Sequence, residues 1–519
     1  MGVMRDRAVH LLSRLSFGPS EAEVERVLEL GEEDWLEQQL APGREEDPRM
    51  LNAMAELETV DMSTARIYAW ITEPFGDRRE NELSSEERTQ LQRRRRIPRN
   101  ENIRATFWRA LYSSRQVEAV LGEFFRNHFN VSYTKGGPAD FLITEYDREV
   151  IRRHALGSFP EMLMASAKHP AMLHYLDNHL SRRPPSKQEL AEIERRERRR
   201  TDSRERGEQA AEIAAQRGLN ENYARELLEL HTLGVDNGYK QKDVIALAEA
   251  LTGWGYAAGR DADWGFAFRE SMHVKGDKRV LGKKIREDRD HGGVGEGEAI
   301  IEMLAEHKGT AEFIATKLVR FLVADQPPKS LVKDVASTYR KTDGSIPDLV
   351  RAVVRSEEFW ATEHVRAKFR TPLEFLCAAL RATDAEVTDP SRCLTALRDM
   401  GQPILHCDDP TGYYDVAEAW LDPGVMATRW SFALDLATGK VRGVEIPVEF
   451  FDELPQEVPR LWQHHLTKRL LPGGAGQRTR NALSTVTDEY LVKAKVPDSR
   501  ELGPQLVGLL LGSPEFQQQ

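Results

Sequence analysis

Apolar residues recur at helical spacing along most of this chain, whereas few segments alternate between apolar and polar residues as a half-buried strand does. The stretch 313–322 carries such a stripe, with apolar residues three and four positions apart. Signals typical of helix N-termini also occur. Ser20 and Thr371 are each followed three residues later by a glutamate, Glu23 and Glu374, as in a capping box. These patterns predict a chain built mainly from α-helices.

We expect the strand content to be small. Residues 279–285 form the clearest strand-like run, inside a polar region at 257–298 that lies between stronger helical segments. The sequence therefore predicts a mainly α fold, a large multi-helix domain with at most a small β-hairpin.

Two strongly charged segments interrupt the helical pattern. Residues 79–104 contain a run of consecutive arginines, and residues 182–206 are dense in arginine and glutamate. Their mixed charge and scarcity of aromatic residues are typical of an exposed charged helix or of a flexible insertion. We expect both insertions to belong to one large helical domain over residues 1–465, with a C-terminal helical extension over residues 466–519 packed on it.

The overall charge limits the partners of the chain. Among its 519 residues, 73 lysines and arginines oppose 84 aspartates and glutamates, which gives a formal net charge of −11. This balance argues against nucleic acid as a partner, because phosphate contacts need a basic face; the arginine runs keep a local basic arm as a minor alternative. No stretch approaches the roughly 20 apolar residues that cross a bilayer, so no membrane span is expected.

The N-terminal residues lack the continuous apolar core and the small-residue cleavage site of a signal peptide. The chain as sequenced is therefore expected in the cytoplasm, with export as the alternative if a leader was trimmed. No Gly-rich phosphate loop, dinucleotide fingerprint, HExxH motif or nucleophile elbow occurs in a convincing context. This excludes the common ATP, NAD, zinc-protease and α/β-hydrolase sites.

The segment 220–234 is the most informative one for chemistry. On a regular helix, Asn222, Glu226 and Glu229 fall within about 40° of one another. Two carboxylates and an amide oxygen on one stripe can chelate a hard cation. The alternative is a solvated polar face, with an ion pair between Arg225 and Glu229.

Two histidines are predicted to lie among apolar side chains. His231 projects about 140° away from Glu226 on a straight helix, so both bind one ion only if the last turn unwinds or another helix supplies ligands. His128 continues an apolar stripe of its own helix. Each histidine is either a hydrogen-bonded core residue or part of a shared buried polar site in which each supplies partners for the other. Asp177 follows an apolar run and can extend this cluster, and His273 opens a loop.

Several motifs of this chain occur together in a known family. They are His10–Gly18, Trp35–Leu40, Phe125–Phe129, Asp177 with Asn178, Glu221–Val235, Ala250–Trp254, His273 with Lys278, Thr310–Leu318, Lys368 with Thr371–Glu374, and Trp420 with Arg429. On these residues the chain resembles, over nearly its whole length, the bacterial family catalogued as domain of unknown function 1800.

The resemblance implies a large, mostly helical domain and brings no established activity. Members commonly carry export signals and resemble products encoded beside sulfatase- or phosphatase-like proteins, which makes such a protein a possible partner. This chain departs from the pattern at two places. Val274 follows His273 where an aspartate is usual, which would leave a His–Asp pair incomplete, and Tyr413 follows Gly412 where a tryptophan is expected.

Two hypotheses about function follow. The first is a metal-dependent or acid–base enzyme, a hydrolase or an oxidoreductase, with a buried pocket of histidine, glutamate, asparagine and aspartate side chains. Its expected catalytic residues are His128, Glu226, His231 and His273. The expected ligands of a divalent metal ion, the one cofactor considered, are Asp177, Asn222, Glu226, Glu229 and His231. The second hypothesis is a non-catalytic helical scaffold that binds a partner protein, such as the sulfatase- or phosphatase-like one, with the histidines and acids satisfying one another in the core.

Overall fold

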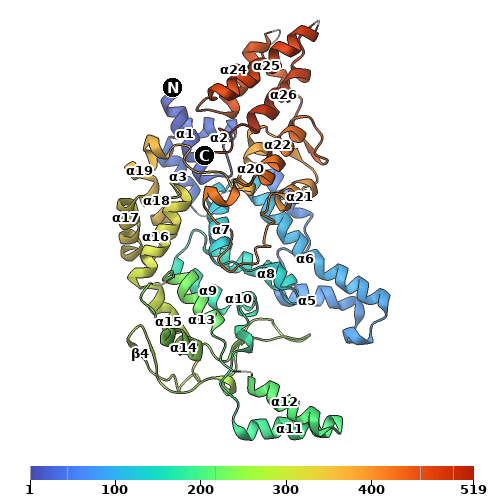
Figure 1. Cartoon of the computed structure of the whole chain (residues 1–519), viewed down its shortest axis with the longest axis vertical. Helices are drawn as coiled ribbons and strands as arrows, with labels where there is room; N and C mark the ends of the chain where they lie inside the picture. Colours follow the sequence, from blue (N-terminus) through green and yellow to red (C-terminus); the bar gives the residue numbers. More distant parts are fainter. Residues whose placement is uncertain are drawn as a thin grey trace.

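The computed structural model describes residues 2–41, 43, 45–216, 218–235, 237–455, 458–494 and 496–519. Helices dominate this part of the chain, and strands occur only in short pairs, so the predicted mainly α fold class is confirmed. The molecule is elongated, with the C-terminal helices at one end and a charged helical hairpin at the other (Figure 1). In the described part of the chain, no helix combines the length and the apolar character needed to cross a membrane.

The N-terminal third of the chain is helical, and its helices begin where side chains cap them. The side chains of Ser20 and Ser84 accept hydrogen bonds from backbone N–H groups three residues ahead, which satisfies donors that a helix start leaves free. The helices are α1 (Gly2–Leu15), α2 (Glu21–Leu30), α3 (Glu32–Leu40), α4 (Pro48–Ala55), α5 (Thr64–Thr72), α6 (Ser85–Tyr112), α7 (Gln116–His128) and α8 (Ala139–Tyr146).

The middle of the chain contains two π-helical segments, η4 (Asp147–Arg152) and η6 (Leu227–Thr232), which continue α8 and α13. At the end of η6 the backbone N–H of Leu233 donates to the carbonyl of Leu228 at 2.9 Å, five residues back, which is the spacing of a π-helix. The α-helices of this region are α9 (Phe159–Lys168), α10 (Pro170–Tyr175), α11 (Lys187–Thr201), α12 (Arg204–Gln216), α13 (Asn222–Glu226) and α14 (Gln241–Ala250).

Three antiparallel strand pairs lie in the second half of the chain. The predicted hairpin at 279–285 is present as β3 (Lys278–Val280) and β4 (Lys283–Ile285), joined at Leu281 and Gly282, which both have positive φ. The other two pairs join segments too short for strand periodicity to be recognised in the sequence. They are β1 (Trp254–Tyr256) with β2 (Phe266–Phe268), and β5 (Glu386–Val387) with β6 (Val444–Glu445).

The remaining helices form the second half of the body and the C-terminal end. They are α15 (Val294–Ala305), α16 (Lys308–Leu322), α17 (Lys329–Lys341), α18 (Ile346–Val354), α19 (Glu357–Trp360), α20 (Pro372–Ala382), α21 (Ser391–Asp399), α22 (Pro423–Ala437), α23 (Glu449–Asp452), α24 (Pro459–Leu470), α25 (Gln477–Lys493) and α26 (Ser499–Leu511). The short 3₁₀ turns are η1 (Glu73–Phe75), η2 (Glu80–Glu82), η3 (Tyr133–Lys135), η5 (Asn178–Leu180), η7 (Glu270–Met272), η8 (Thr362–His364) and η9 (Ala417–Trp420). The expected boundary between residues 465 and 466 falls inside α24, and a separate C-terminal extension stays a prediction.

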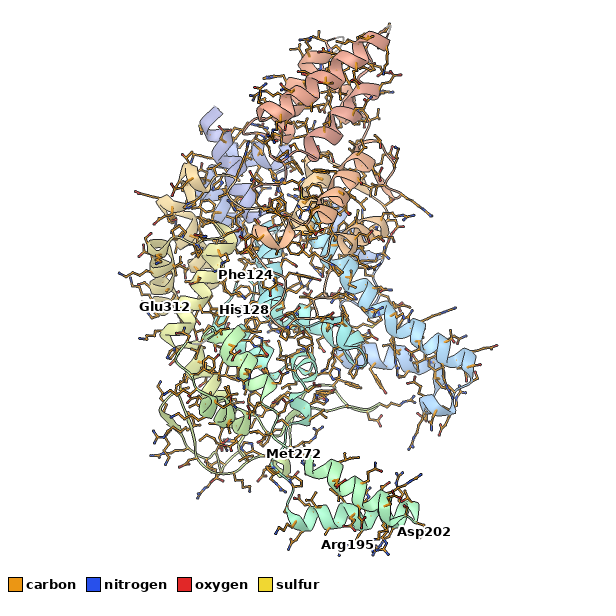
Figure 2. The ribbon with its side chains drawn as sticks, viewed as in Figure 1. Phe124, His128, Arg195, Asp202, Met272 and Glu312 are labelled. Atoms are coloured by element: carbon orange, nitrogen blue, oxygen red, sulfur yellow. The ribbon has the colours of Figure 1, made fainter. Side chains whose placement is uncertain are left out.

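The two charged insertions are helical. The first lies largely in α6, where the Arg94 guanidinium stacks on the Trp70 ring at 3.9 Å. The second forms the antiparallel hairpin of α11 and α12, which projects from the body, with Arg195 about midway along α11 and Asp202 at the tip (Figure 2). No residue of α11 is buried, so the hairpin is held at its base, where Arg183 pairs with Glu189 at 2.7 Å.

Candidate active site between helices α7 and α16

Helix α7 brings His128 into the interior. Its apolar face, which includes Val117 and Phe125, is buried, and His128 ends the same stripe with 1% of its surface exposed. The imidazole lies among aromatic rings, with the ring centroid of His231 at 6.2 Å. Figure 2 shows Phe124 and His128 in the interior of the molecule, beside α16.

The hydrogen bonds of His128 define its tautomer. Its Nε2 lies 3.2 Å from the backbone carbonyl oxygen of His231, and because a carbonyl only accepts, Nε2 carries the proton and donates it. Nδ1 is therefore the acceptor for Lys317 Nζ at 3.0 Å. Burial, followed by the nearby Lys317 and His231, lowers the pKa of His128 well below its usual value, so the ring is neutral.

Lys317 lies in α16, 189 residues after His128 in the chain. Burial of its amine lowers its pKa to about 8; Asp415 acts against this shift and Arg320 adds to it. Among the described residues, no carboxylate oxygen lies within 4 Å of Lys317 Nζ. A substantial fraction of this amine is therefore neutral at mildly alkaline pH, which a lysine needs to act as a base.

Lys317 lines a pocket of about 160 Å³. The pocket lies between α7, α16, the start of α20 and the loop 400–416. Its polar lining includes Glu123, Asn127, Lys317, Arg320, Thr371, Glu374, Tyr413 and Asp415, and its apolar lining includes Phe17, Val120, Phe124 and Phe321. The rings of Phe124 and Phe321 lie 5.2 Å apart and form one wall.

The carboxylates of this pocket already have partners. Asp415 Oδ1 accepts a hydrogen bond from Lys368 Nζ at 2.8 Å, and Glu123 Oε2 accepts one from Arg126 at 2.6 Å. Burial nevertheless raises the pKa of Asp415 to about 6.

Glu374 is satisfied in the same way. One of its oxygens accepts from the Thr371 backbone N–H at 2.7 Å, as in the predicted capping box, and the other accepts from the Gln519 side chain at 3.0 Å.

The two cations that line the pocket are not paired in this way. In the described part of the chain, neither Lys317 nor Arg320 has a carboxylate within 4 Å. Arg320 donates through Nε to the backbone carbonyl of Asp325 at 3.2 Å, which leaves the two terminal nitrogens of its guanidinium for another acceptor. The donors that remain in the pocket therefore suit an anionic group.

Asn127 holds the loop 400–416 over the pocket. Its amide nitrogen donates to the Tyr413 carbonyl and its amide oxygen accepts from the Tyr413 N–H, each at 2.6 Å. Position 412 requires glycine: its φ is +77°, and a Cβ there would lie 2.3 Å from the Asn127 carbonyl oxygen. The tyrosine that replaces the expected tryptophan donates its hydroxyl to the Pro403 carbonyl at 2.7 Å.

The structure brings His231 next to His128 but not into the pocket. His231 lies in the π-helical segment η6, is 2% exposed, and its ring packs against Phe129 at 5.2 Å. Burial, with a smaller effect of Lys317, lowers the pKa of His231 to about 3. The two histidines share one buried polar cluster through the His231 carbonyl, with Lys317 as its third member.

The acidic residues expected as metal ligands lie on a more exposed face. Glu226 is partly buried, and burial, Glu229 and Asp409 raise its pKa. Glu229 forms the alternative ion pair with Arg225, at 3.5 Å, and Asn222 is exposed.

Asp177 lies apart from this face and accepts a hydrogen bond from Lys135 at 2.8 Å. Over the described ranges, no three or more histidine, cysteine, aspartate or glutamate side chains are arranged to hold a metal ion. The metal prediction gains no support from this arrangement.

His273 lies in a separate buried cluster with Lys278 and Glu296. Its Nδ1 lies 2.9 Å from the Thr252 carbonyl, and its Nε2 lies 3.3 Å from Glu296 Oε2, which also accepts from Lys278 Nζ. The side chains of all three cluster members are at most 1% exposed. Within the described residues, no hydrogen bond, ion pair or ring contact links His273 to His128, His231 or Glu226.

Several of the landmark motifs thus contribute to two buried clusters and one pocket, through Phe17, Asn127, His128, His231, His273, Lys278, Lys317, Thr371 and Glu374. The model of a family described as "Protein of unknown function (DUF1800)" matches residues 10–518, nearly the whole chain. The chain belongs to the DUF1800 family. No curated protein and no solved structure matches it. Membership of DUF1800 therefore confirms the resemblance and leaves the activity open.

Lys317, Arg320 and Asp415 were not predicted from the sequence as site residues. Lys317 is part of a DUF1800 landmark, Thr310–Leu318, in which a lysine interrupts an apolar stripe, and this was the one signal available. Helical periodicity places a residue on a face of its own helix, but it does not identify the helix that packs against that face.

Proposed function

We propose that the pocket between α7 and α16 is the active site of an acid–base enzyme that acts on a small organic anion, with Lys317 as the base. The observation that carries this proposal is the environment of Lys317. Lys317 lines a pocket, and its amine lies 3.0 Å from the neutral His128 Nδ1 and has no carboxylate partner among the described residues. A lysine with a lowered pKa in a cleft is a candidate catalytic group.

The neighbouring residues fit complementary roles. Arg320 would bind the anionic group of the substrate, because its terminal nitrogens face no carboxylate among the described residues. Phe124 and Phe321 would contact the apolar part. His128 accepts a hydrogen bond from Lys317 and thereby orients the amine; it is a positioning residue. Lys317, when neutral, would take a proton from water or from a substrate hydroxyl, as a hydrolase requires.

The proposal is tested with anionic esters as substrates. We expect hydrolysis of at least one of 4-nitrophenyl phosphate, 4-nitrophenyl sulfate and a carboxylated 4-nitrophenyl ester. Lys317→Met should lower kcat about 10²–10⁴-fold, the usual contribution of a general base. Lys308→Met is the matched control, because Lys308 is an exposed lysine at the start of the same helix. Equal rates for Lys317→Met and the wild type, or hydrolysis of none of the three esters, would exclude this role.

A partner-binding scaffold is the second candidate, and the projecting hairpin favours it. Residues 195–206 contain seven arginines and three acidic residues, on the hairpin of α11 and α12 that projects from the body (Figure 1). Such a tip suits an acidic surface of a partner protein, and the family resemblance implies a sulfatase- or phosphatase-like one. Co-elution of the two purified proteins in gel filtration should be lost with Arg198 and Arg199 both changed to Glu, and kept with Arg286→Glu on another exposed loop. Absence of co-elution for the wild type would remove this candidate.

A further inference from the structure

A second cavity lies on the other side of α7. It has a volume of about 110 Å³ and is lined by Arg109 of α6, Arg126 of α7 and Arg152 of η4. Glu123 and Phe17 contribute to the linings of both this cavity and the Lys317 pocket. We name it the arginine cavity.

Three guanidinium groups of the arginine cavity surround one buried carboxylate, Asp147. Arg126 Nε donates to Asp147 Oδ1 at 2.8 Å, which is a full hydrogen bond. Arg109 Nη1 and Arg152 Nε are 3.9 Å and 4.0 Å from Oδ2, beyond hydrogen-bond distance. Asp147 therefore forms a hydrogen bond with Arg126 alone, and the guanidinium groups of Arg109 and Arg152 make only longer ion-pair contacts with it.

The π-helical turn contributes to this arrangement. In a π-helix the residue five positions ahead lies about one turn above the first. Asp147 and Arg152 are the first and last residues of η4, so both are directed to the same side of the helix. A regular α-helix would turn Arg152 away from Asp147 by about 140°.

The hydrogen-bonding capacity of Arg109 and Arg152 is largely unused. The structure gives the Arg109 guanidinium no hydrogen bond to any described residue, and Arg152 Nε is buried without an acceptor. A guanidinium has five donors, and an unpaired cation in a buried place is costly. Burial, together with Arg152 and Arg126, lowers the pKa of Arg109 to about 9, which reflects this missing compensation.

The acidic side chains of the lining are engaged elsewhere. Glu46 accepts hydrogen bonds from the Ser113 hydroxyl and the Ser114 N–H, at 3.0 Å and 2.9 Å. Glu123 pairs with Arg126 at 2.6 Å, and Glu118, whose pKa is raised by burial, lies 3.7 Å from Arg115. None of them lies within 4 Å of the Arg109 or Arg152 guanidinium.

We propose that Arg109 and Arg152 bind a phosphate-sized oxyanion in the arginine cavity. The two forks offer parallel N–H donors that match the oxygens of a tetrahedral anion. The anion adds negative charge where one carboxylate, Asp147, is shared among three arginines. The cavity is well above the ~15 Å³ that one water molecule needs. Solvent reaches it, since the side chains of Arg109 and Arg152 are 15% and 25% exposed. The site does not depend on the chemistry assigned to Lys317.

The test is a calorimetric titration of the full chain with inorganic phosphate, at constant ionic strength in chloride. Arg109→Gln and Arg152→Gln should each weaken phosphate binding ~10-fold or more, the effect of losing one charge-assisted hydrogen bond. Arg153→Gln is the matched control, because Arg153 is the next residue in the chain and its side chain is 70% exposed. Lys317→Met should leave this affinity unchanged, which separates the arginine cavity from the Lys317 pocket.

A further variant and a second ligand complete the design. Arg152→Lys keeps a positive charge beside Asp147 and lacks the fork; we expect its affinity for phosphate to lie between those of Arg152→Gln and the wild type. Phenyl phosphate should bind more tightly than inorganic phosphate if the anion belongs to an organic ligand, and equally if it is a free ion. No phosphate binding, or wild-type affinity in both Arg109→Gln and Arg152→Gln, would overturn the proposal. Loss of phosphate binding in Lys317→Met alone would assign the anion to the other pocket and overturn it equally.

Discussion

The buried cluster of His273, Lys278 and Glu296 allows a direct test of whether His273 is a structural residue. Glu296 Oε2 accepts from Lys278 Nζ and lies 3.3 Å from His273 Nε2, while Glu296 Oε1 accepts from the Asp288 N–H at 3.1 Å. Every one of these contacts joins Glu296 of α15 to the segment that precedes this helix. If the cluster is structural, removal of its single negative charge should destabilise the fold.

The variant Glu296→Gln keeps the shape of the side chain and removes its charge. Lys278 would then be a buried cation whose remaining partners are the Val274 carbonyl, the His273 ring and an uncharged amide. Removing one partner of a buried ion pair costs about 3–5 kcal/mol of unfolding free energy, because the other charge is left uncompensated. A loss of this size changes the folding equilibrium by a factor of more than ~100.

Urea denaturation at neutral pH measures this loss as a shift of the midpoint at constant slope. Glu298→Gln is the matched control on the same helix, because its ion pair with Lys168 is partly exposed and should contribute less than ~1 kcal/mol. Adding Lys278→Met to Glu296→Gln should recover part of the stability. An unfolding free energy of Glu296→Gln within 1 kcal/mol of the wild type, or equal to that of Glu298→Gln, would refute the assignment.

Four more predictions concern the pocket and the expected metal ligands. Gly412→Ala should lower the melting temperature and any pocket activity, because a Cβ would collide with the Asn127 carbonyl at a φ of +77°; differential scanning calorimetry with an unchanged thermogram would contradict this. The pH–rate profile should rise through about pH 8, where Lys317 loses its proton, and this limb should vanish in Lys317→Met. The pKa of Lys317 is lower in the folded chain than the ordinary value of 10.5 expected when unfolded. The unfolding free energy of the wild type should therefore rise with pH between about 8 and 10.5, whereas that of Lys317→Met should lack this increase, and urea denaturation at several pH values measures both. Dialysis against a chelator should leave the melting temperature unchanged, because Glu226 and Glu229 form no three-ligand group; a fall restored by a divalent metal ion would revive the metal hypothesis.

The sequence predicted most of the fold because helix signals are local. The caps at Ser20 and Thr371, and the hairpin at 279–285, depend on residues a few positions apart, so they are visible in one chain without a partner. The strand pair β5–β6 joins residues 57 positions apart or more and has two residues in each strand, which leaves no periodic pattern to detect.

The candidate site was predicted in part for the same reason. The apolar surroundings of His128 and His231 follow from helical spacing, and the structure places the two rings side by side. Their partner Lys317 lies in α16, 189 residues after His128, and local spacing in the sequence does not show that α16 packs against α7. The stripe of Asn222, Glu226 and Glu229 has the spacing of a metal site, yet the same spacing is produced by a solvated face with an Arg225 pair, and spacing alone does not separate the two.

The π-helical segments allow the chain to differ in length at two places. A π-helix holds about one residue more per turn than an α-helix, so deleting one residue from η6 would convert it to a regular helix. Four residues of α-helix turn the chain by about 400°, close to the single turn that five residues make in the π-helix, so His231 would keep its direction relative to Glu226. For the same reason, deleting one residue from η4 would keep Arg152 on the side of Asp147. Single-residue gaps at 147–152 or 227–232 in an alignment of relatives would therefore be compatible with both sites, whereas a gap inside a regular helix would rotate the residues beyond it by about 100°.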